Sequence, residues 1–594
     1  MKSYRFTVEH CFYGLALVLA LILRTWSLGA KPLSDIESGW ALQALSVAHG
    51  EPIALGAQLG YIFPTGLLFW LIGSSDFLAR LWPALAGGLL VLAPFFLRHR
   101  LGRGAALVAA FGLAIDPGLV ALSRLAGGPM PAIGLGFLAL SLAITQNWAA
   151  AGIFTGLALL SGPAILQGLL ILIFAWGMAK ALGKPMNQSL SSELSQSNAI
   201  TSENLRRVGL AVVGVILLVG TLFFRYPQGL GAWLSALPAY LHSWTSSSEI
   251  PWQRLLIVLV IYQPLALFFG LDGAALAWIH LRDGSENARL RLLCSLGLVA
   301  SILLALLTPG RGVTDLGWVL VILWILAGIG LVGIYSGQAY KTKIVYGLGL
   351  AFLILMAFLW LQLATISQLI PGTRLDYVRI IVLLALIILG GLLTWLVSAG
   401  WSWGIARLGL ACGLVCSLGI YTFSNVWGIV QLKPELQEID RQELWTVYPV
   451  TGQAGLLLST IGDLSEWKTG RREALDITVA IDVPSIRWAL RSYPNVKYLP
   501  EHQSLAHLGE EGSDLPSLIL SRQEDEAPNL TTVYKGEGFG WWLKPDWSGT
   551  MPPDFLRWLV FRQAPWQNEQ VILWARGDLF PGGAVVPKGT GNVP

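Results

Sequence analysis

The chain has 594 residues, of which 54% are hydrophobic and only 12% are charged, and its mean hydropathy is +0.62. A soluble protein of this length needs much more charge on its surface. The composition therefore excludes a soluble globular protein and indicates a chain solvated mainly by lipid. The net charge of +4 is small, and no basic patch indicates binding of nucleic acid.

About thirteen stretches are apolar and long enough to be read as membrane-spanning helices, since a span needs about 20 apolar residues. They lie at roughly 9–28, 77–98, 104–122, 129–146, 148–162, 163–182, 207–224, 253–280, 291–307, 316–335, 344–366, 379–398 and 405–428. The first is expected to remain as an uncleaved helix. A further apolar stretch, 62–73, is too short to cross and predicts a helix that lies at the membrane surface or dips into it.

The placement of lysine and arginine predicts the orientation of these helices. Basic residues gather in every second loop, beginning with Lys2 and Arg5 and continuing with Arg98, Arg100 and Arg103. Because such loops stay in the cytoplasm, the bias places the N-terminus inside. Thirteen crossings then place the C-terminal region outside the cytoplasm.

The charge balance divides the chain into two domains. Residues 1–432 carry 24 Lys and Arg against 14 Asp and Glu, whereas residues 433–594 carry 15 against 21. We therefore expect a membrane domain over 1–432, whose first outer loop covers 29–76, and a soluble extracytoplasmic domain over 433–594. The whole is expected to be a multi-pass integral protein of the plasma membrane.

The C-terminal region alternates strand and helix patterns. Strands are predicted at 476–482, 496–499, 517–521 and 570–575, and a helix opened by a proline at 484–492. This alternation indicates an α/β domain. The domain contains nine tryptophans. In a domain next to a bilayer, tryptophan side chains fill the core or lie at the membrane interface more often than they stack on sugars.

Two acids, Asp35 and Glu37, follow the first span in the segment PLSDIESGWALQAL. Ser34 with Glu37 three residues later is a capping-box pattern, and Asp35 is favourable at a helix N-terminus. A structural role at the start of a helix is therefore one interpretation. Acids next to a membrane bundle also mark functional sites, so a catalytic role is the other.

A series of short motifs surrounds these acids. Leu23-Arg24 ends the first span, Pro32 precedes the acids, and an Ala-rich helix leads to Gly50-Glu51-Pro52. The series continues with Gly73-Ser74-Ser75, Arg80-Leu81-Trp82-Pro83-Ala84, Asp116-Pro117 and Ser123-Arg124. In order and spacing the segment 24–145 resembles the membrane glycosyltransferases of the GT-C superfamily. It is most similar to the protein O-mannosyltransferases (glycosyltransferase family 39) and their bacterial aminoarabinose-transferase relatives.

Two positions depart from that family pattern. Gly127-Gly128 follows Ser123-Arg124, where relatives often carry another acid, and the acid pair itself is split. The relatives usually carry adjacent Asp and Glu, whereas here Ile36 separates the two acids. Alignment on Ala41-Leu42-Gln43-Ala44 places Glu37 on the family's Glu and Ile36 where its Asp should be. Asp35 would have to shift by one residue to act as the catalytic acid.

The resemblance implies a GT-C-like bundle and an inverting transfer of a sugar from a polyprenyl-phosphate-linked donor to an acceptor at the outer face. A carboxylate must take the proton of the acceptor hydroxyl, with Asp35 the first candidate and Glu37 the second. The leaving phosphate needs cations, and Arg311, Arg124 and Arg80 lie at expected outer helix ends. For each arginine the alternative is snorkelling to the interface.

No cofactor is implied by the resemblance. The D-x-E spacing is also similar to that of metal-binding acids in oligosaccharyltransferase relatives, which keeps a divalent ion as an alternative. The sequence leaves open whether the acceptor is a protein, a lipid or a glycan. Two other functions remain: a non-catalytic GT-C-like scaffold that binds lipid-linked sugar, and a transporter or flippase. The second is disfavoured because no internal repeat and few mid-span charges are present.

Overall fold

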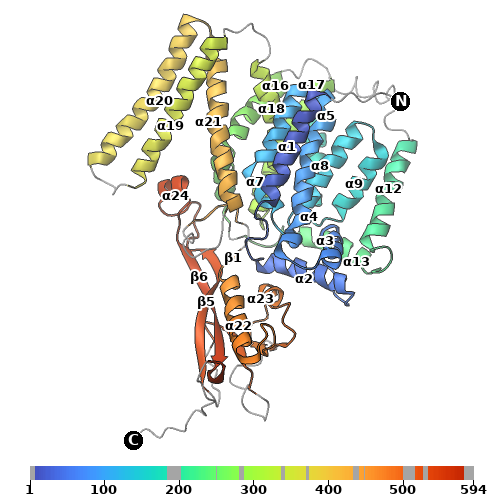
Figure 1. The fold of residues 1–594 in the computed structure, drawn as a ribbon. Helices are drawn as coiled ribbons and strands as arrows, with labels where there is room; N and C mark the ends of the chain where they lie inside the picture. The colour runs from blue at the N-terminus through green and yellow to red at the C-terminus, as the bar shows by residue number, and fades with distance from the viewer. Residues whose placement is uncertain are drawn as a thin grey trace.

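The computed structural model consists of a helical bundle with a smaller domain attached at one end (Figure 1). It describes residues 7–182, 202–248, 250–279, 286–335, 342–368, 374–431, 441–446, 449–499, 515–525 and 533–580.

The bundle is built from helices in chain order. Its first part contains α1 (Val8–Thr25), α2 (Asp35–His49), α3 (Leu59–Ile72), α4 (Asp76–Leu89), η1 (Leu90–Leu92), α5 (Ala93–Leu101), α6 (Arg103–Ile115), α7 (Pro117–Ser123), α8 (Met130–Ile144), α9 (Trp148–Leu159) and α10 (Ala164–Ala181). Its second part contains α12 (Ser202–Gly220), α13 (Gly229–Leu234), α14 (Ala236–His242), α15 (Trp252–Tyr262), α16 (Pro264–Ile279), α17 (Glu286–Leu307), η4 (Val313–Leu316), α18 (Gly317–Tyr335), α19 (Thr342–Ile366), α20 (Arg374–Gly400) and α21 (Trp403–Gln431).

The chain is an integral membrane protein by these helices. Within the described residues, eight helices are long and apolar enough to cross a membrane, or up to ten if each of two bent helix pairs counts as one span. This is fewer than the thirteen expected from the sequence. Two of the expected spans form only the short helices α8 and α9, and α12 begins with Glu203, Arg206 and Arg207. The apolar stretch 62–73, predicted to form a helix too short to cross the membrane, lies in α3.

The break between α6 and α7 is stabilised by a buried arginine. Pro117 has no N–H to complete the helix, and the two helices bend by 55°. Arg24 donates instead to the carbonyl oxygens of Leu113 (2.9 Å) and Ala114 (3.1 Å) and to the hydroxyl of Ser123 (3.1 Å). Asp116 accepts the N–H of Leu119 at 2.7 Å and so caps α7. The motif residues Arg24 and Asp116 therefore have structural roles.

Helix α18 forms the centre of the bundle. It packs against α6 and α16, and small residues let the backbones approach. A Cβ built on Gly328 would lie 2.3 Å from the carbonyl oxygen of Ala105, and one on Gly273 would lie 2.0 Å from that of Leu326. Lipid offers no hydrophobic drive for helix association, so this close packing is what holds such helices together.

The C-terminal domain contains a six-stranded sheet in the order β1-β5-β6-β4-β2-β3. The elements are β1 (Val450–Thr451), α22 (Ala454–Thr469), β2 (Ile477–Val479), α23 (Pro484–Ala489), β3 (Val496–Tyr498), β4 (Leu518–Arg522), β5 (Tyr534–Pro545), α24 (Phe555–Phe561), β6 (Trp566–Arg576) and η7 (Gly577–Leu579). Strands β2, β3 and β4 are parallel, and the rest pair antiparallel.

The predicted α/β character of this domain is confirmed, since all four predicted strands and the helix after Pro484 are present. The longest strand, β5, was not predicted. Its sequence contains three glycines, at 536, 538 and 540, which weaken any strand pattern. Its pairing with β6 supplies the missing stability.

The domain lies at the end of the bundle where α2, α3 and α13 are found, as Figure 1 shows. Its extracytoplasmic location stays a prediction from the Lys/Arg bias.

An alkaline phosphatase fused after Pro594 should be active, because that enzyme needs export, and a green fluorescent protein at the same site should remain dark. A fusion truncated after Gly102 should show the reverse, since it follows two spans. A fluorescent full-length fusion would overturn the orientation.

Candidate functional site

The capping box predicted at the start of α2 is present. The Oγ atom of Ser34 accepts the backbone N–H of Glu37 at 3.4 Å, and the carboxylate of Glu37 accepts the backbone N–H of Ser34 at 3.1 Å. Glu37 is 3% exposed. Its position is therefore fixed by the first turn of the helix that carries it.

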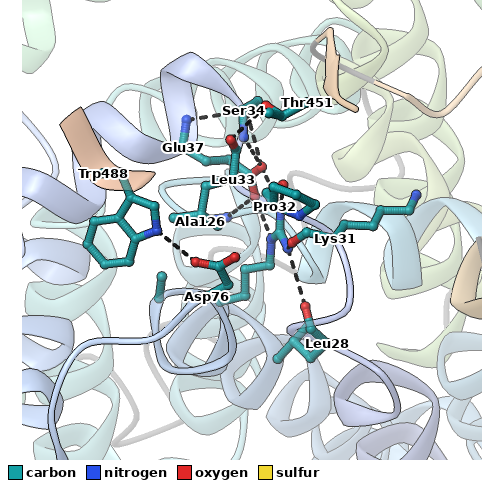
Figure 2. Close-up of polar contacts among 12 residues, drawn as sticks. Leu28, Lys31, Pro32, Leu33, Ser34, Glu37, Asp76, Ala126, Thr451 and Trp488 are labelled. Atoms are coloured by element: carbon teal, nitrogen blue, oxygen red, sulfur yellow. Dashed lines mark hydrogen bonds and ion pairs between the residues drawn. The ribbon is translucent and has the colours of Figure 1, made fainter. Parts of the chain in front are cut away.

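Glu37 also forms a buried two-point ion pair with Arg80 of α4. Nε of Arg80 donates to Oε1 at 2.8 Å and Nη2 donates to Oε2 at 2.7 Å. The N–H of Ala126 donates to Oε1 at 3.0 Å. Figure 2 shows Ser34 and Ala126 around this carboxylate. Both oxygens thus accept several hydrogen bonds.

The remaining donors of Arg80 hold the loop that follows α1. Its Nη1 donates to the carbonyl oxygens of Leu28 (3.3 Å) and Lys31 (2.6 Å), and its Nη2 to that of Pro32 (3.1 Å). Burial alone would raise the pKa of Glu37. The charge and hydrogen bonds of Arg80 outweigh burial and leave that pKa below its usual value. Glu37 is therefore ionised where it pairs with Arg80.

Asp35 binds the C-terminal domain. Its Oδ1 accepts the backbone N–H of Ser485 at 3.2 Å, and its Oδ2 accepts the indole N–H of Trp542 at 2.6 Å. Neighbouring contacts reinforce this junction: the indole of Trp488 donates to Asp76 at 2.7 Å, a contact drawn in Figure 2. Asp35 is absent from the walls of the cavity described next.

A cavity of about 100 Å³ lies between the loop after α1 and the segment that leads into the C-terminal domain. Charged side chains are concentrated in its wall: Lys31, Glu37, Arg80, Arg124 and Glu443. The structure thus brings together three of the five residues selected from the sequence. We call this space the basic cavity.

Arg124 and Arg311 differ in their relation to the basic cavity. Arg124 lines it, but its guanidinium donates to the carbonyl oxygens that end α1, among them those of Trp26 at 2.8 Å and Arg24 at 3.2 Å. Arg311 does not line it and donates from Nε to the carbonyl oxygen of Thr308 at 3.1 Å. Sequence position alone could not separate these two arginines.

Lys31 is a cavity residue that the sequence analysis missed. Its ammonium donates no hydrogen bond within the described residues, whereas Arg80 and Arg124 are occupied by carbonyl and carboxylate oxygens. Burial lowers the pKa of Lys31 to about 8, and the charges of Arg80 and Arg124 add to that effect. The ammonium is still the main form at pH 7. Its place directly before Pro32 was the only signal in the sequence.

Glu443 is the second residue that was missed. It follows α21 and is 6% exposed. No motif surrounds it, and its contacts come from residues far away in the chain, such as Tyr262.

Among the described residues, no three His, Cys, Asp or Glu side chains gather as a metal site would require. The expectation of a reaction without a cofactor is not tested by that and stays a prediction.

The sequence and the fold were compared with those of known proteins. No protein-family model and no curated protein matches the sequence. Two solved structures of ArnT from Cupriavidus metallidurans, one in the apo state and one bound to undecaprenyl phosphate, are similar in fold. Each has a TM-score of 0.52 and 14% sequence identity, and the match covers 95% of this chain and 97% of ArnT. Arabinosyltransferase EmbB from Mycobacterium smegmatis is less similar, with a TM-score of 0.41 and 14% identity over 72% of this chain and 42% of EmbB.

ArnT, an aminoarabinose transferase, is a member of the GT-C superfamily. At 14% identity the likeness to ArnT establishes the fold. This chain therefore has the GT-C fold that the motifs between residues 24 and 145 indicated. The fold includes the C-terminal domain, because the match to ArnT extends over nearly the whole of both chains.

The buried Glu37–Arg80 pair generates a test of stability. Glu37→Ala leaves a buried guanidinium without its counter-ion and should cost about 3–5 kcal/mol. The matched control Glu569→Ala removes a half-exposed ion pair with Lys544 and should cost about 1 kcal/mol or less. Unfolding midpoints in detergent, followed by tryptophan fluorescence, measure both. Because the folded pKa of Glu37 is lowered, its contribution is complete at neutral pH and is lost only as pH falls through that lowered pKa. Equal midpoints for the two variants would contradict the role given to Glu37.

Proposed function

We propose that the chain is a GT-C-type glycosyltransferase that moves a sugar from a polyprenyl-phosphate-linked donor to an acceptor at the outer face of the membrane. The observation that carries the proposal is the basic cavity, whose wall includes Lys31, Arg80 and Arg124, and in which the ammonium of Lys31 donates no hydrogen bond within the described residues. Three cations face two carboxylates, Glu37 and Glu443, in this wall, and the excess of positive charge suits an anionic ligand.

The chemistry follows from that charge. As the bond between the anomeric carbon and the phosphate oxygen breaks, negative charge grows on the leaving phosphate, and cations fixed nearby stabilise it. Arg124 contributes a fixed positive charge, because its donors are occupied by neutral carbonyl oxygens, whereas the charge of Arg80 is offset by Glu37. Lys31 can donate hydrogen bonds directly, since its ammonium is a compact charge with three donors.

The donor class is supported by the neighbour in fold. ArnT was solved with undecaprenyl phosphate bound, and the basic cavity here lies at the same end of the bundle as the C-terminal domain. A polyprenyl phosphate is therefore the ligand that we expect the basic cavity to bind. The inverting course, the sugar and the acceptor remain proposals.

The roles of Asp35 and Glu37 as candidate bases stay predictions. Their contacts favour structural roles, since Glu37 is bound to Arg80 and Asp35 to Ser485 and Trp542. The same contacts support a second candidate function, a GT-C-like scaffold that binds a lipid-linked sugar without transferring it. The two functions differ in whether any carboxylate at the cavity takes a proton.

Lys31→Ala should weaken binding of undecaprenyl phosphate by roughly 10- to 100-fold, the value of a charge-assisted hydrogen bond. Lys31→Arg should restore part of the affinity. Lys497→Ala, which removes an exposed lysine on β3, is the matched control and should bind as the wild type does. Titration of the purified protein in nanodiscs with undecaprenyl phosphate measures all three. Wild-type affinity in Lys31→Ala would remove Lys31 from the site.

Asp35→Asn separates docking from catalysis. The amide keeps an oxygen that can accept the Trp542 or Ser485 N–H, so the docking role predicts a loss of about 1 kcal/mol in stability and a nearly unchanged transfer rate. A catalytic base predicts normal folding and a rate lower by about 10²- to 10⁴-fold. We expect the first result. The rate is measured as release of undecaprenyl phosphate from a labelled undecaprenyl-phosphate-linked sugar, in membranes that contain the full chain.

A further inference from the structure

Glu443 lies where two cavities meet. It lines the basic cavity and also a larger groove of about 640 Å³ between α15, α19, α21 and α24. Side chains such as Leu353, Met356 and Leu418 make most of the groove apolar. Figure 1 shows α24 close to the ends of α19 and α21, and residues 559–561 of α24 line the groove. Glu443 is thus the one carboxylate common to the walls of both spaces among the described residues.

One oxygen of Glu443 is held and the other is available. Oε2 accepts the hydroxyl of Tyr262 and lies 3.6 Å from Nε of Arg562. The Tyr262 hydroxyl in turn accepts the backbone N–H of Leu444 at 3.1 Å, which fixes its direction. Oε1 accepts no hydrogen bond within the described residues and lies next to Gly428, which has no side chain to cover it. A carboxylate with one oxygen oriented by a neighbour and the other free has the geometry of a positioned base.

Buried donors beside Glu443 have no partner. Nη1 of Arg562 and Nδ2 of Asn425 make no hydrogen bond, although Arg562 is only 9% exposed and Asn425 only 6%. Both side chains line the groove. A buried donor without an acceptor costs about 1–3 kcal/mol, so such donors indicate a ligand oxygen that completes them.

The backbone at Arg562 is strained. Its φ of +60° lies in the left-handed region, which non-glycine residues seldom adopt. The conformation is held by hydrogen bonds from Nη2 to Asn425 (2.8 Å) and to the hydroxyl of Tyr421 (3.2 Å). Strain of this kind persists where the surroundings require a particular side-chain position. The required position here places the guanidinium in the wall of the groove, with Nε 3.6 Å from Oε2 of Glu443.

We propose that Glu443 is the general base of the transfer, reached by the acceptor from the groove. This rests on the function proposed above. The acceptor hydroxyl gives its proton to Oε1 of Glu443, and its oxygen forms the new bond to the anomeric carbon. The bond from that carbon to the phosphate oxygen breaks, and its electron pair leaves with the polyprenyl phosphate on the side of Lys31. Nη1 of Arg562 and Nδ2 of Asn425 donate to oxygens of the acceptor.

The charges around Glu443 suit this role. Burial raises its pKa above the usual value, and Arg562, the Tyr262 hydroxyl, Lys31 and Arg441 partly oppose that rise. A base works best when its pKa is close to the working pH. Because the base must be ionised, the rate should fall on acidification, and the fall should begin at a higher pH than for an ordinary glutamate.

The test compares Glu443→Gln with the wild type in the labelled-donor assay, in membranes containing the full chain. Glu443→Gln should lower the transfer rate by about 10²- to 10⁴-fold, in a protein that still folds and still binds undecaprenyl phosphate. Glu569→Gln, in a half-exposed glutamate of β6, is the matched control and should keep the wild-type rate. Tyr262→Phe should keep part of the rate and shift its pH profile, because Tyr262 positions the base.

The outcomes separate this inference from the function on which it rests. An active wild type with an equally active Glu443→Gln overturns Glu443 as the base and leaves the glycosyltransferase intact. A wild type that binds undecaprenyl phosphate but releases none from any labelled donor overturns the enzyme and the base together, in favour of the scaffold. If Glu443→Gln does not fold, Glu443→Asp decides. It keeps the carboxylate but shortens its reach, so a wild-type rate and pH profile would overturn the proposal, and a lowered rate with a shifted profile would support it.

Discussion

The buried ion pair between Glu37 and Arg80 is the interaction on which the arrangement of this protein depends. A carboxylate and a guanidinium removed from water lose several kcal/mol of hydration each, and only a two-point pair with its other hydrogen bonds satisfied recovers that loss. Here Ser34, Ala126 and the carbonyl oxygens of residues 28, 31 and 32 satisfy those bonds. One pair therefore joins α2, α4 and the loop after α1. Replacing either partner leaves the other as an uncompensated buried charge.

That fixed loop serves two other parts of the molecule. Asp35, two residues before Glu37, presents both carboxylate oxygens to the C-terminal domain. The hydroxyl of Thr451 donates to the carbonyl oxygen of Leu33 at 2.9 Å in the same junction. Since Trp445 and Thr451 line the basic cavity together with Lys31, the C-terminal region completes the wall of this cavity. Membrane bundle and C-terminal domain thus form one site, which agrees with a likeness to ArnT that covers both.

Cations that look alike in the sequence have different physical roles in this site. Arg24, Arg80 and Arg124 use planar, multiply donating groups to satisfy backbone carbonyls at a helix break, in a loop and at the end of α1. In a membrane protein such carbonyls must find donors within the protein, because lipid supplies none. The arginines are therefore occupied by the fold. Lys31 keeps its donors, and Glu443 keeps one oxygen, so these two are available to a ligand.

The sequence by itself determined the class of the molecule. Its apolar runs indicated an integral membrane protein, and the motifs between residues 24 and 145 indicated the GT-C fold. Period-two patterns predicted four of the six strands of the C-terminal sheet. The capping box at Ser34 and Glu37 was also predictable. These features depend on residues close together in the chain, where spacing and side-chain type are enough.

Only the tertiary structure decided which charged groups are used by the fold and which are free. Glu37 meets Arg80 across 43 positions, Asp35 meets Trp542 across 507, and Glu443 meets Tyr262 across 181. The span number also depended on it, since α8 and α9 are short and α15 and α16 are bent by 96° at their junction. The physical reason is that the state of a buried charge is set by the few atoms within hydrogen-bond reach, and those atoms come from distant parts of the chain that folding alone brings together.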